Sequence, residues 1–284
     1  MTGPATRTLS TRSGLKLSAT AWNGDRGGII LAHGGGQTRH AWRRTGMRLA
    51  RQGYSVLAYD LRGHGESDWD ANGDYSLSRF RDDLCDVASV FDRPPIVVGA
   101  SLGGISAMLA AGEAAAAFAA VILVDVAPRI ERVGSDRILG FMRRHIHRGF
   151  DSVAEAASAV SDYVPNRPKP VSHAGLEKYL RSSADGRLRW HWDPQVLTEP
   201  DSIATVPLEH ERLADAARRM TMPVMLVRGG HSHVVSLDSV AEFLTLVPHA
   251  RYETLADAHH MIVGDENDSF TASLLDFIGS NTTA

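Results

Sequence analysis

The sequence lacks the features that assign a function by composition alone. With one cysteine among its 284 residues, Cys85, the chain can form neither an internal disulfide nor a thiolate metal cluster. Its 30 basic and 33 acidic side chains give a net charge of −3, which excludes a nucleic-acid binder driven by charge. Residues 1–20 contain no continuous apolar run of the kind found in a secretory signal.

Long hydrophobic runs are also missing. The most apolar stretch, 114–126, is interrupted by Asp125 and falls short of the ~20 residues that a membrane-spanning helix requires. We therefore expect a soluble globular protein of the reducing cytoplasm, with neither a nucleic acid nor a membrane as its partner. The sequence leaves open whether copies of the chain associate as a homo-oligomer.

Short apolar runs alternate with helical patterns through the first half of the chain. Four runs are almost continuously apolar, as strands buried on both faces of a parallel sheet are: 29–32, 55–59, 96–98 and 121–124. One helix between them is marked by apolar residues at spacings of three and four: Leu77, Phe80, Leu84, Val87 and Phe91. This alternation predicts an α/β fold, with a mostly parallel, doubly wound sheet. An antiparallel hairpin over residues 6–22 leads into the sheet.

The pattern is interrupted over residues 129–215, where no clear buried strand is found. The segment is too long for a loop, so we expect a helical cap inserted into a core made of residues 1–128 and 216–284. Alternating strands and helices then resume at 222–227, 236–247, 251–255 and 267–279.

Many of the 26 glycines lie in three turns, each directly after a predicted buried strand. The turns read HGGGQ over 33–37, DLRGHGES over 60–67 and GASLGG over 99–104. Ligands of open parallel sheets bind beyond the carboxyl ends of the strands, where all three turns lie. We therefore expect the three turns to build one site.

The third turn fits the pattern G-x-S-x-G, a sharp strand-to-helix reversal. Side chains at Gly99 and Gly103 would collide with the neighbouring backbone, and Ser101 is forced into a strained conformation. The hydroxyl of Ser101 is then presented at a helix N-terminus, whose dipole favours developing negative charge. A phosphate-binding loop is the alternative, but no Lys-Ser or Lys-Thr follows and no GxGxxG occurs. Ser101 is therefore the predicted nucleophile.

In this order and at these strand ends, the three turns resemble an α/β-hydrolase-fold enzyme with a serine nucleophile. The resemblance covers nearly the whole chain. It implies an oxyanion hole built from the backbone N–H groups of Leu102 and Gly35, and it implies no cofactor. His33 is predicted to hold its own turn in place rather than to transfer a proton.

A serine hydroxyl needs an adjacent base to become a good nucleophile at neutral pH. In this fold the base follows the last strand, where the chain reads ADAHHM over 256–261. Alignment on the His-Met pair assigns the base to His260 and leaves His259 in place of the usual glycine. His259 is the alternative base, or a residue that lines the substrate pocket.

The triad acid is harder to assign. Many relatives carry it after the strand that corresponds to 222–227, but His233 occupies that position here and supplies no fixed negative charge. Asp125 ends the strand at 121–124 in the turn D-V-A-P, and some esterases of this fold carry their acid in such a turn. A buried carboxylate needs a partner, which the base would provide. We predict Asp125 as the acid; the alternatives are Asp238 or another acid of that loop, or no functional acid.

Two weaker signals concern the pocket and a metal. Four tryptophans are candidates either to wall an apolar pocket between core and cap or merely to pack the cap onto the core: Trp42, Trp69, Trp190 and Trp192. Zinc bound by His231, His233 and the pair 259–260 is disfavoured, because a serine site is already complete nearby. No metal is therefore expected.

The residues together predict a serine hydrolase of small, mostly apolar carboxylic esters. One alternative is hydrolysis of a carbon–carbon bond in a ring-cleavage product, which uses the same triad. Another is a non-catalytic, ligand-binding member of the fold, suggested by His233 in the usual acid position.

Overall fold

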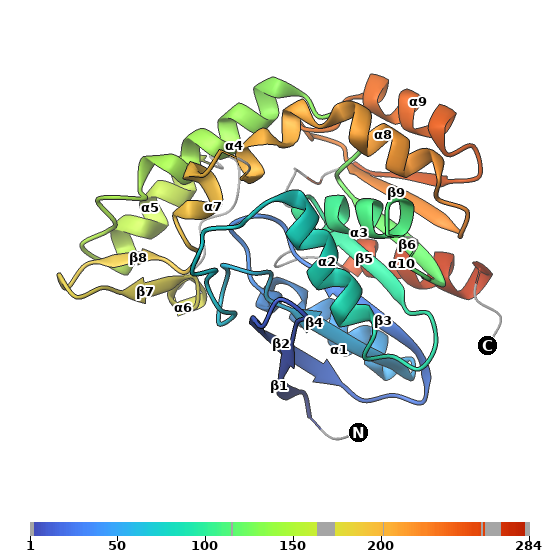
Figure 1. Ribbon diagram of the computed structural model, residues 1–284, viewed down its shortest axis with the longest axis horizontal. Helices are drawn as coiled ribbons and strands as arrows, with labels where there is room; N and C mark the ends of the chain where they lie inside the picture. The colour runs from blue at the N-terminus through green and yellow to red at the C-terminus, as the bar shows by residue number, and fades with distance from the viewer. Residues whose placement is uncertain are drawn as a thin grey trace.

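An eight-stranded sheet forms the centre of the protein (Figure 1). The computed structural model describes residues 3–114, 116–163, 174–200, 202–256, 258 and 268–281. The strand order is β1-β2-β4-β3-β5-β6-β9-β10. The strands are β1 (Ala5–Ser10), β2 (Lys16–Trp22), β3 (Arg26–Ala32), β4 (Tyr54–Tyr59), β5 (Ile96–Ala100), β6 (Ala120–Val124), β9 (Val224–Gly229) and β10 (Arg251–Leu255). The pairs β1–β2 and β2–β4 are antiparallel and the other pairs are parallel, which confirms the predicted sheet and its entry hairpin.

Helices cover both faces of the sheet, which explains why its central strands are apolar throughout. Every residue of β5 and β6 is buried. Val97 packs toward the layer of α2 (Leu77–Ala88), α3 (Leu102–Gly112), α8 (His210–Arg218) and α9 (Leu237–Leu246). Its neighbours Ile96 and Val98 pack toward the opposite layer, made of α1 (Arg43–Arg51) and α10 (Asp268–Asn281).

The chain between β6 and β9 leaves the sheet and forms a separate set of short elements, which extends to one side in Figure 1. The elements are α4 (Arg132–Arg144), α5 (Val153–Tyr163), α6 (Ala174–Glu177), β7 (Leu180–Ser182), β8 (Leu188–Trp190), α7 (Gln195–Thr198) and the 3₁₀ helix η2 (Ile203–Leu208). The sequence does not predict the β7–β8 hairpin, because its three-residue strands are partly exposed and give no buried apolar run.

The following helix, α8, packs against α3 and α9, so the chain is back on the sheet before residue 215. The division into core and cap stays a prediction. None of the described helices is both long and apolar enough to cross a membrane.

Candidate active site

Ser101 lies at the tip of the turn between β5 and α3, in a strained backbone conformation. Its φ is 46° and its ψ is −113°, a combination that costs of the order of 1–3 kcal/mol for a residue other than glycine. A Cβ on Gly99 would lie 2.5 Å from the carbonyl oxygen of Gly103, and a Cβ on Gly103 would lie 2.5 Å from that of Ala32. The predicted collisions are therefore confirmed, and the turn requires both glycines.

Two backbone N–H groups beside Ser101 have no hydrogen-bond partner in the part of the chain that the structure describes. They belong to Leu102, the first residue of α3, and to Gly35. The N–H groups on either side of Gly35 are occupied, because Gly34 donates to Gln37 Oε1 (3.0 Å) and Gly36 donates to His64 Nε2 (3.1 Å). A Cβ on Gly34 would lie 3.3 Å from that of Ser101, so the glycine loop lies against the serine.

His33 and His64 are buried and hold these turns through both of their ring nitrogens. His33 Nδ1 donates to the Gly34 carbonyl (2.8 Å), and His33 Nε2 accepts the N–H of Leu61 (3.0 Å). His64 Nδ1 donates to the Arg62 carbonyl (2.9 Å). Burial lowers the pKa of His33 to about 4 and the pKa of His64 to about 3, so both rings are neutral at pH 7. The predicted role of His33 as a holder of its turn is confirmed.

Asp125 lies in the turn directly after β6 and is completely buried. Its Oδ1 accepts the N–H of Gly229 (2.9 Å), and its Oδ2 accepts the hydroxyl of Ser232 (2.7 Å). The two alternative positions are both exposed: His233, in the usual acid position, and Asp238, at the start of α9. The loop that follows β9 therefore holds the carboxylate of Asp125 in place.

The predicted base His260, its alternative His259 and the neighbouring Asp257 lie outside the described residues. Ala258, just before the two histidines, is described, and its carbonyl accepts the N–H of His231 (3.0 Å). The chain that leads to the predicted base therefore runs beside the loop that binds Asp125.

Three of the four candidate pocket tryptophans contact side chains outside the glycine loop. Trp42 is fully buried beneath α10, 6.2 Å from the ring of Phe270, and therefore belongs to the core packing. Trp69 is 40% exposed and lies under the guanidinium of Arg181. Trp190, the last residue of β8, packs edge-on against Phe150, which lies between α4 and α5.

Trp192 is the tryptophan that reaches the glycine loop, and two apolar side chains that the sequence did not single out lie there with it. A Cβ on Gly36 would be 3.8 Å from Trp192 Nε1 and 3.2 Å from Met142 Cε, and a Cβ on Gly35 would be 3.2 Å from Ile203 Cδ1. Met142 lies in α4 and Ile203 begins η2. No local pattern marks either residue, because their position depends on how residues 129–215 fold over the turn.

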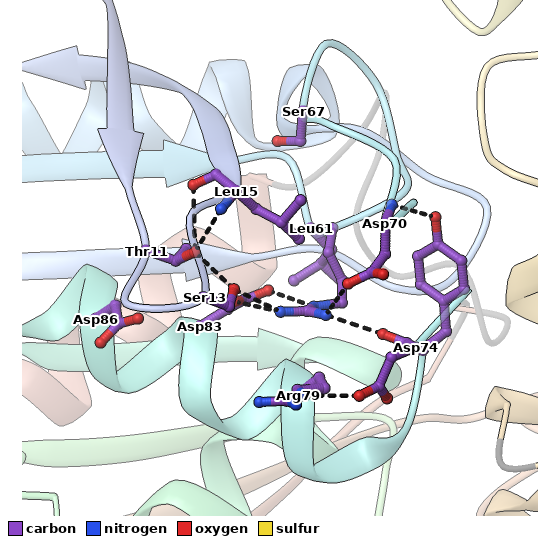
Figure 2. Close-up of polar contacts among 12 residues, drawn as sticks. Thr11, Ser13, Leu15, Leu61, Ser67, Asp70, Asp74, Arg79, Asp83 and Asp86 are labelled. Carbon is purple, nitrogen blue, oxygen red and sulfur yellow. Dashed lines mark hydrogen bonds and ion pairs between the residues drawn. The ribbon is translucent and has the colours of Figure 1, made fainter. Parts of the chain in front are cut away.

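A buried ion pair fixes the second glycine turn. The guanidinium of Arg62 donates through Nε and Nη2 to both carboxylate oxygens of Asp83 (2.7 and 2.8 Å). Its Nη1 donates to the Asp74 carbonyl (2.9 Å) and to Asp70 (3.2 Å). Figure 2 shows Asp70, Asp74 and Asp83 on this network, which Ser13 and Thr11 continue toward the entry hairpin. Arg62 therefore holds the second glycine turn in place.

A doubly wound sheet with a strained serine at a strand-to-helix turn defines an α/β hydrolase. The sequence profile of the alpha/beta hydrolase family matches residues 29–273, and the chain belongs to this family. It is a hydrolase, in agreement with the names of its relatives.

Similar relatives are known from sequence and from structure. Esterase Rv0045c of Mycobacterium tuberculosis is 30% identical over 240 residues, which cover 83% of this chain and 76% of the esterase. The sn-1-specific diacylglycerol lipase ABHD11 of Mus musculus is 25% identical over 245 residues, covering 81% of this chain and 73% of the lipase. An alpha/beta hydrolase from Novosphingobium aromaticivorans superposes with a TM-score of 0.81 at 24% identity, over 98% of this chain and 99% of the other.

Proposed function

We propose that this chain is a serine hydrolase that cleaves small, mostly apolar carboxylic esters through an acyl-enzyme on Ser101. The observation that carries the proposal is the strained Ser101 beside two N–H groups, of Leu102 and Gly35, that no described residue accepts. Backbone strain of this size persists only where the surrounding fold enforces it, and it is typical of functional positions. Two donors held beside a nucleophile match the requirements of an oxyanion hole.

The reaction follows from these groups in two steps. Ser101 Oγ attacks the ester carbonyl carbon while His260 accepts the hydroxyl proton, and the resulting oxyanion accepts hydrogen bonds from Leu102 and Gly35. The intermediate expels the alcohol, which takes its proton from His260, and the acyl group stays on Ser101. Water then attacks the acyl carbon with His260 as the base, which releases the carboxylic acid and restores the serine.

Asp125 is proposed as the residue that orients His260 and stabilises its protonated form. Support comes from the complete burial of its carboxylate and from the loop 229–235, which binds that carboxylate and also contacts Ala258. A buried carboxylate is retained where a cationic or N–H partner offsets its desolvation. The N–H of Gly229 and the hydroxyl of Ser232 each donate one hydrogen bond to the carboxylate, and the proposal adds the ring N–H of His260 as a further partner.

The substrate class rests on the side chains that face the glycine loop. Met142, Trp192 and Ile203 bring mostly apolar surface within 4 Å of where a Cβ on Gly35 or Gly36 would lie, which favours a small apolar acyl group. The names of two relatives, an esterase and a diacylglycerol lipase, support an ester as the bond cleaved. We also propose that residues 129–215 act as the cap that carries these side chains.

The test combines a covalent probe with a substrate panel. A fluorophosphonate should label the protein at Ser101, and the label should be lost in Ser101→Ala and in His260→Ala. Short p-nitrophenyl esters should be turned over, whereas a vinylogous diketone should not be cleaved. Absence of labelling in the folded wild-type protein would favour the non-catalytic alternative. Preferred cleavage of the diketone would favour the carbon–carbon hydrolase.

A further inference from the structure

Three buried histidines hold successive peptide groups of the loop that contains Gly35. His33 Nδ1 donates to the carbonyl of Gly34, which shares one peptide group with the N–H of Gly35. Because that peptide is trans, its carbonyl and N–H point in opposite directions. The hydrogen bond from His33 is therefore one of the constraints on the direction of the Gly35 N–H.

The next two peptide groups are held by His64 and His191. His64 Nε2 accepts the N–H of Gly36 (3.1 Å), and His191 Nε2 donates to the carbonyl of Gly36 (3.2 Å). Gly36 has a φ of 75°, which places it in the left-handed region that favours glycine. The two histidines thus hold Gly36 on both sides.

His191 differs from the other two histidines in its origin. It lies between β8 and α7, in the segment between β6 and β9 that contacts the glycine turns, while His33 and His64 lie in the turns after β3 and β4. Its Nδ1 accepts the N–H of Gly65 (2.7 Å), which leaves Nε2 to carry the proton that Gly36 receives. Its ring centroid lies 6.0 Å from that of His64. One side chain therefore joins the overlying segment to two of the three glycine turns.

The neutral state of these rings suits the task, because a ring that both donates and accepts cannot be doubly protonated. Burial holds the pKa of His191 well below its ordinary value. The ring is only 2% exposed and is fully engaged by backbone groups, so it is not available as a base.

We propose that His191 is a positioning residue, which with His64 orients the Gly35 N–H, so that the oxyanion hole is complete only when the segment between β6 and β9 is seated on the glycine loop. This inference rests on the proposed function, since it assigns a task to the same site. Stabilisation of the transition state then requires that the segment between β6 and β9 contacts the glycine loop. Binding of the ground-state ester depends on this contact much less.

A pair of substitutions at one position separates this role from a structural one. Gln in place of His191 keeps a donor where Nε2 lies and loses the acceptor for Gly65. Asn keeps an acceptor where Nδ1 lies and loses the donor to Gly36. Each variant gives up one hydrogen bond, so their losses of stability should be similar.

The measurement is kcat and KM for p-nitrophenyl acetate, with melting temperatures for all variants. We expect kcat to fall about tenfold to a hundredfold in His191→Asn and to stay within about threefold in His191→Gln, with KM nearly constant in both. The exposed His147→Gln on the same segment is the control and should match the wild type. Equal kcat values in the Asn and Gln variants would overturn the proposal.

A second pair of variants repeats the test from the other side of Gly36. His64→Gln keeps an acceptor for the Gly36 N–H, and His64→Asn loses it, so kcat should again fall more in the Asn variant. Fluorophosphonate labelling of the wild type, abolished in Ser101→Ala, is run in parallel. If the wild type is neither labelled nor active, the proposed function is refuted. If the wild type is labelled but kcat is equal in the Asn and Gln variants at both His191 and His64, only the role of the histidines is refuted.

Discussion

The hydroxyl of Ser232 donates a 2.7 Å hydrogen bond to Oδ2 of Asp125 and so links the end of β6 to the loop after β9. The same hydroxyl oxygen accepts the N–H groups of Val234 and Val235, each at 3.1 Å. One short side chain thus shapes the loop and fixes the carboxylate. The loop after β9 thus holds a buried carboxylate that comes from the end of the neighbouring strand β6.

Asp125→Asn should reduce kcat for p-nitrophenyl acetate by about 10³–10⁴ with little change in melting temperature. Asn is close in shape and tolerates the positive φ of 50° at this position. Its one amide oxygen can keep the hydrogen bond from the Gly229 N–H while its amide nitrogen faces the hydroxyl of Ser232, so the fold should survive while the negative charge is lost. Asp238→Asn is the matched control, since Asp238 is exposed, and its kcat should equal that of the wild type. An unchanged kcat in Asp125→Asn would remove Asp125 from the mechanism.

Gly99→Ala should prevent folding or lower the free energy of unfolding by more than ~3 kcal/mol, because its Cβ would lie 2.5 Å from the backbone oxygen of Gly103. Gly140→Ala is the matched control, and we expect it to raise the free energy of unfolding. Gly140 lies within α4 and a Cβ there would meet no described atom within 4 Å, so alanine should stabilise the protein by about 0.5–1 kcal/mol. Chemical denaturation of both variants measures the contrast. A Gly99→Ala protein as stable as the wild type would contradict the steric argument.

Local patterns in the sequence predict the sheet, the serine turn and the position of Asp125 at the end of a buried strand. Each of these features depends on residues that are close along the chain. The run at 121–124 becomes β6, and the glycines around Ser101 become the strained turn. Contacts between distant segments carry no such signal. His191 lies 155 residues after Gly36 and shows no pattern that marks it, since its partner is a backbone carbonyl. The placement of Trp42 in the core and of Trp192 over the loop depends in the same way on tertiary packing.

The buried histidines predict a loss of stability in mild acid. Their folded-state pKa values lie below the unfolded value of about 6.5, at about 4 for His33 and about 3 for His64, and lower than usual for His191. The unfolded chain therefore binds more protons between about pH 6.5 and pH 4, and stability must fall as the pH falls through this range. Each histidine contributes up to ~1.4 kcal/mol per pH unit.

Denaturant unfolding at pH 7, 6 and 5 measures this dependence. His64→Gln removes one of the titrating groups, so its free energy of unfolding should decline less steeply with falling pH than that of the wild type. The exposed His147→Gln should leave the slope unchanged. Identical slopes in wild type and His64→Gln would mean that His64 is not held neutral by the fold.

Ile203→Ala should widen the acyl range of the enzyme. Ile203 Cδ1 lies 3.2 Å from the position of a Cβ on Gly35, beside the proposed oxyanion hole, and its removal opens space for a longer chain. We expect the ratio of kcat/KM for p-nitrophenyl hexanoate to that for the acetate to rise about tenfold, the scale set by one or two methylene groups in an apolar pocket. Leu208→Ala is the control, because Leu208 lies in the same short helix η2 but is 69% exposed. If kcat/KM for the two esters changes by the same factor in Ile203→Ala, then Ile203 supports the loop without selecting the acyl group.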